Sequence, residues 1–361
     1  MSEMRAVLVD QAARLFERLC TRQLFEQTER LEWSADLWAA LESAQLPLAS
    51  RSEARGGPGS DLGDALALIR EAGRACLPAP LAETLLAELA LAAAGFAPMD
   101  GPLTVAPVIT EAGLTLKPRG EQWEISGTLR RVPWARHARA VVAIAQAPGG
   151  SATVVLEKPV IAMAGGSYAN EPRDDLAFEG LSLPGRCVRA GGLTVDRLRA
   201  LGAAFRSAAM AGALNRVLEM TVRYAQERQQ FGRPIGKFQA VQQQIAVMAA
   251  EVAAASAAFD ALLDGIGISE ADFEIAATKA RTGEAAGIVA GIAHQVHAAM
   301  GFTHEHALHL STRRLWSWRD EFGNEVEWSE WVGRCVARIG NPEALWSFIS
   351  SEKKVLPGAA A

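Results

Sequence analysis

A short polar corner between two long helical patterns constrains this chain more than any other feature. Residues 223–240 read Arg-Tyr-Ala-Gln-Glu-Arg-Gln-Gln-Phe-Gly-Arg-Pro-Ile-Gly-Lys-Phe-Gln-Ala. One helical pattern ends before Phe231. Pro234 and Gly236 then indicate a turn, and a second amphipathic pattern begins at Phe238. We therefore expect a helix–turn–helix corner with one aromatic ring and several cations, a combination that suits a bound phosphate. The cations are Arg223, Arg228, Arg233 and Lys237.

The pattern of apolar residues changes twice along the 361 residues. Up to about residue 100 it is helical, with one run capped by Ser34 and another capped by Ser60 or Asp61. From 101 to 193, short β-branched runs separated by turn residues predict a small β-sandwich or barrel; they begin at Leu103, Trp123, Ala140 and Thr153. From 194 to 361 the helical period returns. We expect an α+β fold with an N-terminal helical domain (1–100), a middle β-domain (101–193) and a C-terminal helical bundle (194–361).

Apolar stripes at helical spacing predict which faces of the C-terminal helices are buried. Alanine fills much of the sequence between the larger residues, so these helices can approach one another closely. The stripes are Met210, Leu214, Val217 and Tyr224; Ile245, Met248, Val252, Phe259 and Leu262; and Ile288, Ile292, Val296 and Ala299.

Composition and charge exclude several classes of function. Half of the residues are hydrophobic, 21% are charged and the net charge is −5, which gives no electrostatic reason to bind nucleic acid. No apolar run appears long enough to span a bilayer, and acidic residues interrupt the N-terminus, so we expect neither a membrane segment nor a secretory signal. The four cysteines lie far apart in sequence, as is typical of reduced thiols in the cytoplasm.

The corner resembles the "R-x-x-F-G-x-x-I-x-x-F-Q" motif of acyl-CoA dehydrogenases, flavoenzymes that desaturate acyl-CoA thioesters; here it runs from Arg228 to Gln239. The order of helices, strands and helices is also similar to the architecture of that family, which has a four-helix bundle at its C-terminus. Residues 123–133 and 138–145 look like the family's strands that flank the flavin. Residues 173–176, Arg-Asp-Asp-Leu, resemble a segment of its short, steroid- and side-chain-degrading members.

The resemblance implies FAD as the cofactor and roles for three residues of the corner. By position in the motif, Arg228 would meet the pyrophosphate, while Gln230 and Phe231 would lie along the adenosine side of an FAD held mostly by a neighbouring subunit. Such sharing implies a homo-oligomer or a hetero-oligomer. The alternative for the corner is a solvated helix end with one buried ring.

A second stretch, residues 295–310, resembles the family's "Q-x-x-G-G-x-G-F" loop, which passes under the FAD adenosine. Gln295, Gly301 and Phe302 match this motif, but Ala298 and Ala299 replace the glycine pair. We expect a β-carbon at Ala299 where the loop comes close to the cofactor, which weakens this copy of the site. The alternative is an ordinary helix end stopped by Gly301.

Five histidines crowd the same region: His294, His297, His304, His306 and His309. Imidazoles three residues apart can share a helix face and bind a metal. However, no carboxylate lies within the helical pair, no cysteine is near, and Gly301 separates the two groups. We therefore expect structural imidazoles and no metal.

The catalytic base that the resemblance requires is poorly matched. Many members have a glutamate about twenty residues after the glycine loop, and Glu321 is the nearest acid here, one residue out of register, with Asp320 as a weaker candidate. Other members have the base on the helix before the corner, where spacing leads to Gly202. An exposed acid near a turn is by default solvated surface.

Three functional readings remain open. The first is a FAD-dependent acyl-CoA dehydrogenase with Glu321 as its base, acyl-CoA as substrate and an electron-transfer flavoprotein as electron acceptor. The second is a partner subunit of a heteromeric dehydrogenase, which contributes Arg228 and Phe231 to a shared FAD and has lost its own base. The third, from another class, is a helical interaction or metal-binding protein.

Overall fold

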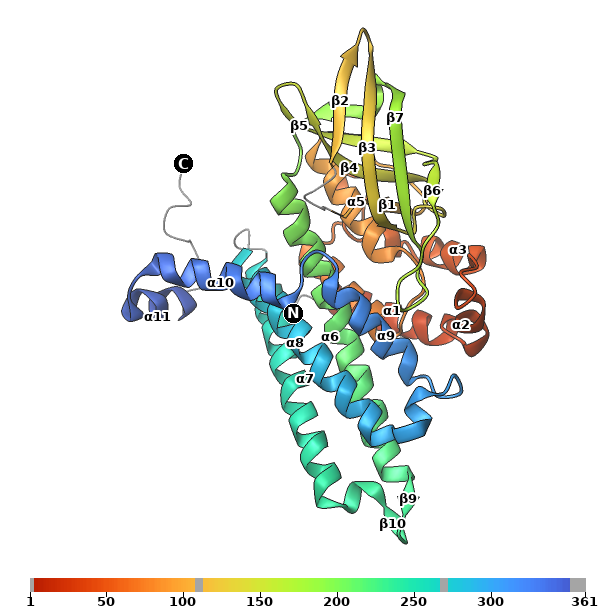
Figure 1. Ribbon diagram of the computed structural model, residues 1–361, viewed down its shortest axis with the longest axis vertical. Helices are drawn as coiled ribbons and strands as arrows, with labels where there is room; N and C mark the ends of the chain where they lie inside the picture. The colour runs from red at the N-terminus through yellow and green to blue at the C-terminus, as the bar shows by residue number, and fades with distance from the viewer. Residues whose placement is uncertain (1–2, 108–112, 267–271, 351–361) are drawn as a thin grey trace. The chain divides into compact units, whose positions relative to one another are not determined.

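The computed structural model describes residues 3–107, 113–266 and 272–350 (Figure 1). The chain divides into two compact units: Met1–Ala65 with Pro78–Gly202, and Leu66–Leu77 with Ala203–Ala361. The expected domain limits at 100/101 and 193/194 fall between elements, after helix α5 (Leu81–Ala93) and before helix α6 (Val195–Glu227). The division into three domains stays a prediction.

Helices come first in the first unit, as the sequence predicts. They are α1 (Glu3–Leu19), α2 (Arg22–Thr28), α3 (Ala35–Ser43), the first residues of α4 (Leu62–Arg74), and α5. Both predicted caps are confirmed. The Ser34 hydroxyl accepts from the Leu37 amide at 3.3 Å, and the Asp61 carboxylate accepts from the Asp64 amide at 2.7 Å. Each side chain satisfies an amide that the helix itself cannot bond.

An eight-stranded sheet within the described residues follows the helices. Its main path is β6-β7-β3-β2-β4-β5-β8, and β1 pairs with β4 in parallel. The strands are β1 (Leu103–Val105), β2 (Leu114–Arg119), β3 (Gln122–Pro133), β4 (Ala140–Ala147), β5 (Gly150–Glu157), β6 (Ile161–Met163), β7 (Arg173–Pro184) and β8 (Val188–Ala190). All four predicted runs lie in strands.

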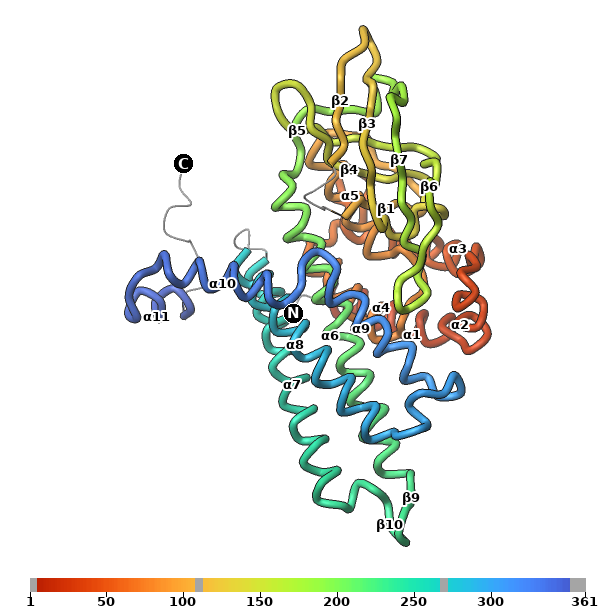
Figure 2. Tube along the Cα trace, in the orientation of Figure 1, coloured from red at the N-terminus to blue at the C-terminus, as the bar shows by residue number. Residues whose placement is uncertain are grey.

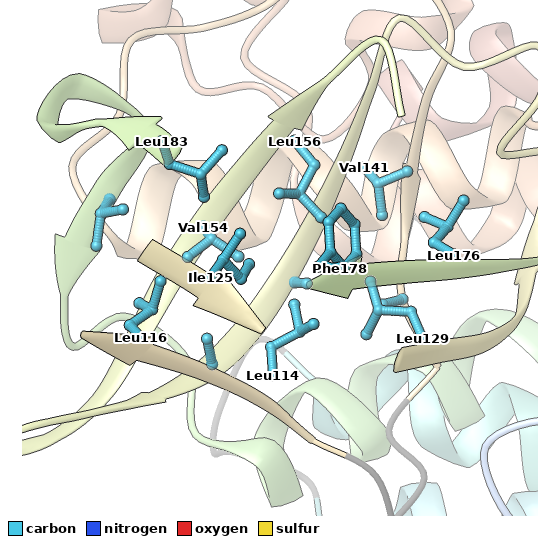
Figure 3. Packing of buried hydrophobic residues seen from close by; sticks show 14 of the residues in the cluster. Leu114, Leu116, Ile125, Leu129, Val141, Val154, Leu156, Leu176, Phe178 and Leu183 are labelled. Carbon is cyan, nitrogen blue, oxygen red and sulfur yellow. The ribbon is translucent and has the colours of Figure 1, made fainter. Parts of the chain in front are cut away.

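The sheet folds over its own apolar core. Figure 3 shows side chains of this core pointing toward one another, among them Leu116 of β2, Ile125 of β3 and Phe178 of β7. Val154 and Leu156 of β5 complete this part of the core, and both are at most 3% exposed. Alternate residues of each strand face inward, which is why the β-branched runs in the sequence signalled strands.

Helices make up the described part of the second unit, apart from a two-stranded hairpin between helices α6 and α7 (Gln239–Gly265) (Figure 2). The chain continues through α8 (Asp272–His297), a 3-10 turn η5 (Ala298–Phe302), α9 (Leu308–Asp320), α10 (Glu325–Ile339) and α11 (Pro342–Ser350). The rest of α4, residues 66–74, belongs to this unit. The predicted order of helices, sheet and helices is confirmed.

The first two predicted stripes are mostly buried, with Tyr224 and Ile245 half-buried, but the stripe on α8 is wrong except for Val296. Ile288 is 42% exposed, whereas its neighbour Val289 is fully buried together with Ala286 and Ala293. Alanine is the most frequent residue on the buried side of α8, because small side chains let neighbouring helices come close. The larger isoleucine is left outside this packing.

Two helical segments, Gln239–Gly265 and Asp272–Phe302, are long and apolar enough to cross a membrane by length and composition. This corrects the expectation that no apolar run is long enough. It is weak support for a membrane segment, because core helices of soluble proteins pass the same test. The expectation of no membrane partner is therefore untested.

Candidate functional site

The polar corner is a helix–turn–helix element with a small hairpin at its tip. Helix α6 ends at Glu227, and β9 (Gln229–Gln230) then pairs with β10 (Arg233–Pro234). The two residues between the strands, Phe231 and Gly232, have φ of 53° and 78°, the left-handed values of a tight two-residue turn. A 3-10 turn, η4 (Ile235–Lys237), leads into α7. The corner was predicted, but the hairpin was not.

Phe231 is both strained and exposed. A left-handed φ costs a residue with a side chain roughly 1 kcal/mol, and glycine or asparagine is preferred at this place in a turn. The side chain is nevertheless 92% exposed, and it contacts the edge-on ring of Phe238 at 6.1 Å. The alternative of a buried ring at a solvated helix end is therefore wrong for Phe231. Backbone strain at a residue whose side chain is not buried is typical of a functional position.

The cations of the corner have no carboxylate partner among the described residues. Arg223, Arg228, Arg233 and Lys237 take part in no ion pair there, although Arg74 of α4 pairs with Glu219 of α6. Arg233 lies over the ring of Phe238 at 4.3 Å. The corner therefore presents positive charge that the described chain leaves unneutralised, beside an exposed ring.

The second predicted segment lies where α8 ends. The helix stops at His297, and η5 carries the chain to Phe302. Ala298 has φ of 50°, so an alanine occupies a left-handed position that favours glycine. Gln295, Ala298 and Ala299 are exposed.

Gly301 is needed for packing and not for its backbone angle. A β-carbon at Gly301 would lie 3.0 Å from Cβ of His297 and 3.3 Å from Nδ1 of His294. The helix also ends four residues earlier than Gly301, so the alternative in which this glycine stops the helix is wrong. Gly301 instead lets η5 pack closely on the last turn of α8.

Tyr224 and His297 bring the two predicted cofactor segments together. Their rings stack at 4.3 Å, and the Tyr224 hydroxyl donates to the carbonyl of His297 at 3.4 Å. Tyr224 lies one turn before Arg228 on α6, and His297 is the last residue of α8. Arg228, Gln230 and Phe231 thus lie on one hairpin, joined through this contact to the segment with Gln295, Ala299 and Gly301.

The imidazoles of this region stack on rings. His294 stacks on Phe302 at 4.6 Å and on Trp316 at 5.5 Å, and His297 contacts His306 at 4.7 Å. Burial lowers the pKa of His294, His297 and His306, which keeps these rings neutral at pH 7. No group of three metal-ligating side chains is placed to hold a metal ion within the ranges that the structure describes.

Glu321 lies at the opposite end of α9 from these imidazoles. Its Oε2 accepts from Nε of Arg206 at 2.6 Å, and the Arg206 side chain is only 5% exposed. Arg206 is 21 residues before the end of α6, which is about 30 Å along the helix. The structure therefore does not bring Glu321 to the Arg228 corner of the same chain. Asp320 is exposed.

The Arg-Asp-Asp-Leu segment of the first unit fixes the chain after β3. Asp174 is fully buried and accepts from the Arg136 side chain, from the Arg136 amide at 3.0 Å and from the Gly165 amide at 3.2 Å. Asp175 accepts from the amide of Arg131, a left-handed residue at an irregularity of β3. Both carboxylates therefore hold irregular backbone in place.

Sequence reasoning missed Arg206 and a second buried cation, Lys279 of α8. Lys279 lies two residues before Arg281, but Arg206 is a lone positive charge in a stretch of alanine, serine and other small or apolar residues. That pattern is a usable signal, because a cation on an apolar face needs a partner that the fold must supply.

Comparisons with known proteins show which family this chain resembles. The family profile "Acyl-CoA dehydrogenase, C-terminal domain" matches residues 195–319. The chain is 32% identical over 265 residues to acyl-CoA dehydrogenase IpdE2 of Mycobacterium tuberculosis, covering 73% of this chain and 74% of that protein.

Two solved structures share the fold. The ChsE4–ChsE5 complex of Mycobacterium tuberculosis has a TM-score of 0.85 at 24% identity, covering 95% of this chain and 99% of that chain. A structure described as the Tcur3481–Tcur3483 steroid ACAD has a TM-score of 0.80 at 25% identity, covering 93% of this chain and 98% of that chain.

Proposed function

The chain belongs to the acyl-CoA dehydrogenase family, and from this premise we propose that it is a FAD-dependent enzyme that desaturates an acyl-CoA thioester. In the proposed reaction, a carboxylate takes the proton from the carbon next to the thioester carbonyl. A hydride leaves the neighbouring carbon, and a double bond forms between the two carbons. When bound, FAD supplies the acceptor for this hydride at its N5 atom.

The single observation that carries this proposal is the unneutralised, exposed corner around Arg228. A pyrophosphate needs cationic donors, and a nucleotide ring needs an apolar or aromatic surface. Arg228, Arg233 and Lys237 supply the first, and the strained ring of Phe231 supplies the second. The contact between Tyr224 and His297 joins this corner to the segment that carries Gln295 and Ala299.

The distance between this corner and Glu321 supports a site shared between subunits. About 30 Å of helix α6 separates Arg206, the partner of Glu321, from the corner. We propose that the corner of one chain holds the diphosphate of a cofactor whose reactive ring lies in another chain. An oligomer is thus part of the proposal.

Glu321 is the proposed base, and Arg206 acts on it directly. A guanidinium beside a carboxylate favours the ionised form, which is the form that accepts a proton. Taking up the proton would break the ion pair, so Arg206 and Glu321 must separate or share the charge with substrate during the reaction. Mutation of Glu321 to Gln keeps its size and removes its ability to act as a base.

A second candidate function is supported by the same ion pair. If Arg206 holds Glu321 throughout, the chain would be the partner subunit of a heteromeric dehydrogenase, with the base on a sister chain. Both solved structures named above are described as two-component proteins. The sister subunit belongs to this second proposal. For both functions we propose an electron-transfer flavoprotein as electron acceptor, a bulky or branched acyl group from lipid or steroid catabolism, and a cytoplasmic location.

The test measures FAD per chain and turnover. The protein is purified alone and with a candidate sister chain, and flavin absorbance is recorded before and after adding FAD. We expect yellow protein in at least one of these preparations. Loss of turnover in Glu321→Gln supports the first function, whereas full turnover of this variant with the sister chain supports the second. Colourless protein that binds no added FAD in either preparation would reject both.

A further inference from the structure

Lys279 is a fully buried lysine whose hydrogen bonds go to the backbone on both sides of Glu321. Its Nζ donates to the carbonyls of Arg319 and Gly323, each at 2.6 Å. The first carbonyl is two residues before Glu321 and the second is two residues after it. Lys279 thus spans the turn between α9 and α10 that carries the proposed base.

The face of α8 that bears Lys279 is shaped to receive this turn. Gly283 and Gly287 follow Lys279 at intervals of four residues and so share its face. A β-carbon at Gly283 would lie 3.1 Å from both Cβ and Oε2 of Glu325, and one at Gly287 would lie 3.3 Å from Nη1 of Arg319. The missing side chains leave room for an ion pair between Arg319 and Glu325.

The turn itself is strained and fixed at several points. Phe322 and Gly323 have φ of 57° and 95°. The indole of Trp328 donates to the carbonyl of Phe322 at 3.0 Å, next to the carbonyl that Lys279 binds. Asn324 caps α10 by accepting from the amides of Val326 and Glu327. A left-handed non-glycine residue persists when its surroundings fix it in this way.

We infer that Lys279 is a positioning residue, which holds the turn of residues 319–325 on α8 and thereby places the Glu321 carboxylate for proton transfer. Lys279 acts on Glu321 through the backbone and touches no reacting atom. The inference rests on the proposed function, in which Glu321 is the base. Arg206 fixes the side chain of Glu321 through an ion pair, and Lys279 fixes the backbone around Glu321 through hydrogen bonds.

The experiment uses hydrogen–deuterium exchange and steady-state kinetics on the complete, FAD-loaded protein. Lys279→Met keeps most of the length of the side chain and removes the nitrogen that donates both hydrogen bonds. Gly283→Ala leaves Lys279 intact but adds a β-carbon against Glu325, and so disturbs the same turn independently. Lys117→Met, at an exposed strand position in the first unit, is the control.

In Lys279→Met we expect at least tenfold faster exchange in peptides covering residues 319–325, with little change in peptides from α6 or the sheet. We also expect kcat to fall tenfold or more while KM for the acyl-CoA changes less than twofold. Gly283→Ala should show the same pattern more weakly. Lys117→Met should behave as the unmodified protein.

Unchanged exchange across residues 319–325 in Lys279→Met and Gly283→Ala would overturn the inference. Faster exchange with unchanged kcat in an active enzyme would also overturn it, because Glu321 would then need no positioning. If the unmodified protein has no turnover with any partner, the proposed function fails. Faster exchange confined to residues 319–325 would then still support the hold of Lys279 on the turn.

Discussion

Two turns in the second unit share a left-handed Phe-Gly pair but have opposite surroundings. Phe231-Gly232 and Phe322-Gly323 both have left-handed φ, at 53° and 78° in the first and 57° and 95° in the second. In the second turn, Lys279 and Trp328 bind the carbonyls, and the nearby cations have carboxylate partners. In the first turn, the ring is exposed and the cations around it have no carboxylate partner among the described residues.

The difference separates a structural use of strain from a binding use. Around Phe322 the protein itself supplies the interactions that hold the unfavourable backbone. Around Phe231 the described chain supplies few of them, so a ligand or another chain is the natural source of the rest. Variants that affect stability at one turn and ligand binding at the other would sharpen this comparison.

The largest expected effect on stability is at the buried pair. Arg206→Ala leaves the half-buried Glu321 without its guanidinium, and we expect the free energy of unfolding to fall by about 3 kcal/mol. Urea unfolding measures this value. Arg228→Ala is the matched variant from the exposed turn, and it should change stability by less than about 0.5 kcal/mol. Equal losses in the two variants would remove the contrast between the turns.

The next effect is on cofactor binding, where the variant at the exposed turn should show the larger change. Arg228→Ala should weaken FAD binding roughly 10- to 100-fold, the range expected for loss of charge-assisted hydrogen bonds. Titration of the apoprotein, with the partner chain if one is required, measures the Kd. Arg14→Ala on α1 removes the same charge from an exposed site and should leave the Kd unchanged. A Kd for Arg228→Ala within twofold of the parent would reject the corner as the phosphate site.

A smaller effect is the pH dependence that Lys279 contributes. Burial lowers its pKa to about 7, against the attraction of Glu321, Glu325 and Asp320 and with a contribution from Arg206. Between about pH 7 and 10.5 the unfolded chain binds this proton and the folded chain does not. Stability should therefore rise with pH in this window, by up to about 1.4 kcal/mol per unit from this group.

Unfolding midpoints at pH 7.5 and 9.5 test this sign. Compared with the unmodified protein, Lys279→Met should lose the increase in stability between these two pH values, whereas Lys117→Met should keep it. The difference between variants matters here, because burial also raises the pKa of Cys187 and Cys335, which acts in the opposite direction at high pH. A rise of the same size in Lys279→Met would mean that Lys279 is protonated in the folded state throughout.

The smallest effect concerns the loop beside the corner. Ala298→Gly should stabilise the protein by up to about 1 kcal/mol, because it removes the cost of a left-handed alanine. Ala299→Gly, whose φ is not left-handed, should destabilise it by up to about 1 kcal/mol. Thermal unfolding of the two variants decides the order. If both are destabilised, the backbone at Ala298 is not strained.

Sequence reasoning located the corner, the helix caps and the strands because each depends on local chemistry. Ser34 and Asp61 cap helices with their own side chains, and the β-branched runs alternate with the pleat. The hairpin at Phe231 was missed because its turn goes against the usual residue preference. The Ile288 stripe was wrong because alanine packing, which carries little periodic signal, decides the buried side of α8.

The surroundings of Glu321 were not predictable for a different reason. Arg206 and Lys279 are 115 and 42 residues away from it in sequence, so no spacing rule connects them to the turn. A buried cation can be recognised in a sequence, but its partner is set by tertiary packing. The roles of Arg228, Gln230, Phe231, Gln295, Ala299, Gly301 and Glu321 stay predictions.

Helix α6 leads into the exposed turn at one end and contacts the other turn through Arg206. Its length therefore sets a limit on insertions and deletions. Arg206 and Tyr224 are 18 residues apart, which is about five full helical turns, so both side chains project from one side of the rod. Adding or removing a single residue between them would rotate one end by about 100° relative to the other. Relatives that keep both the ion pair at Arg206 and the ring stack at Tyr224 should therefore tolerate substitutions in this stretch but no change in its length.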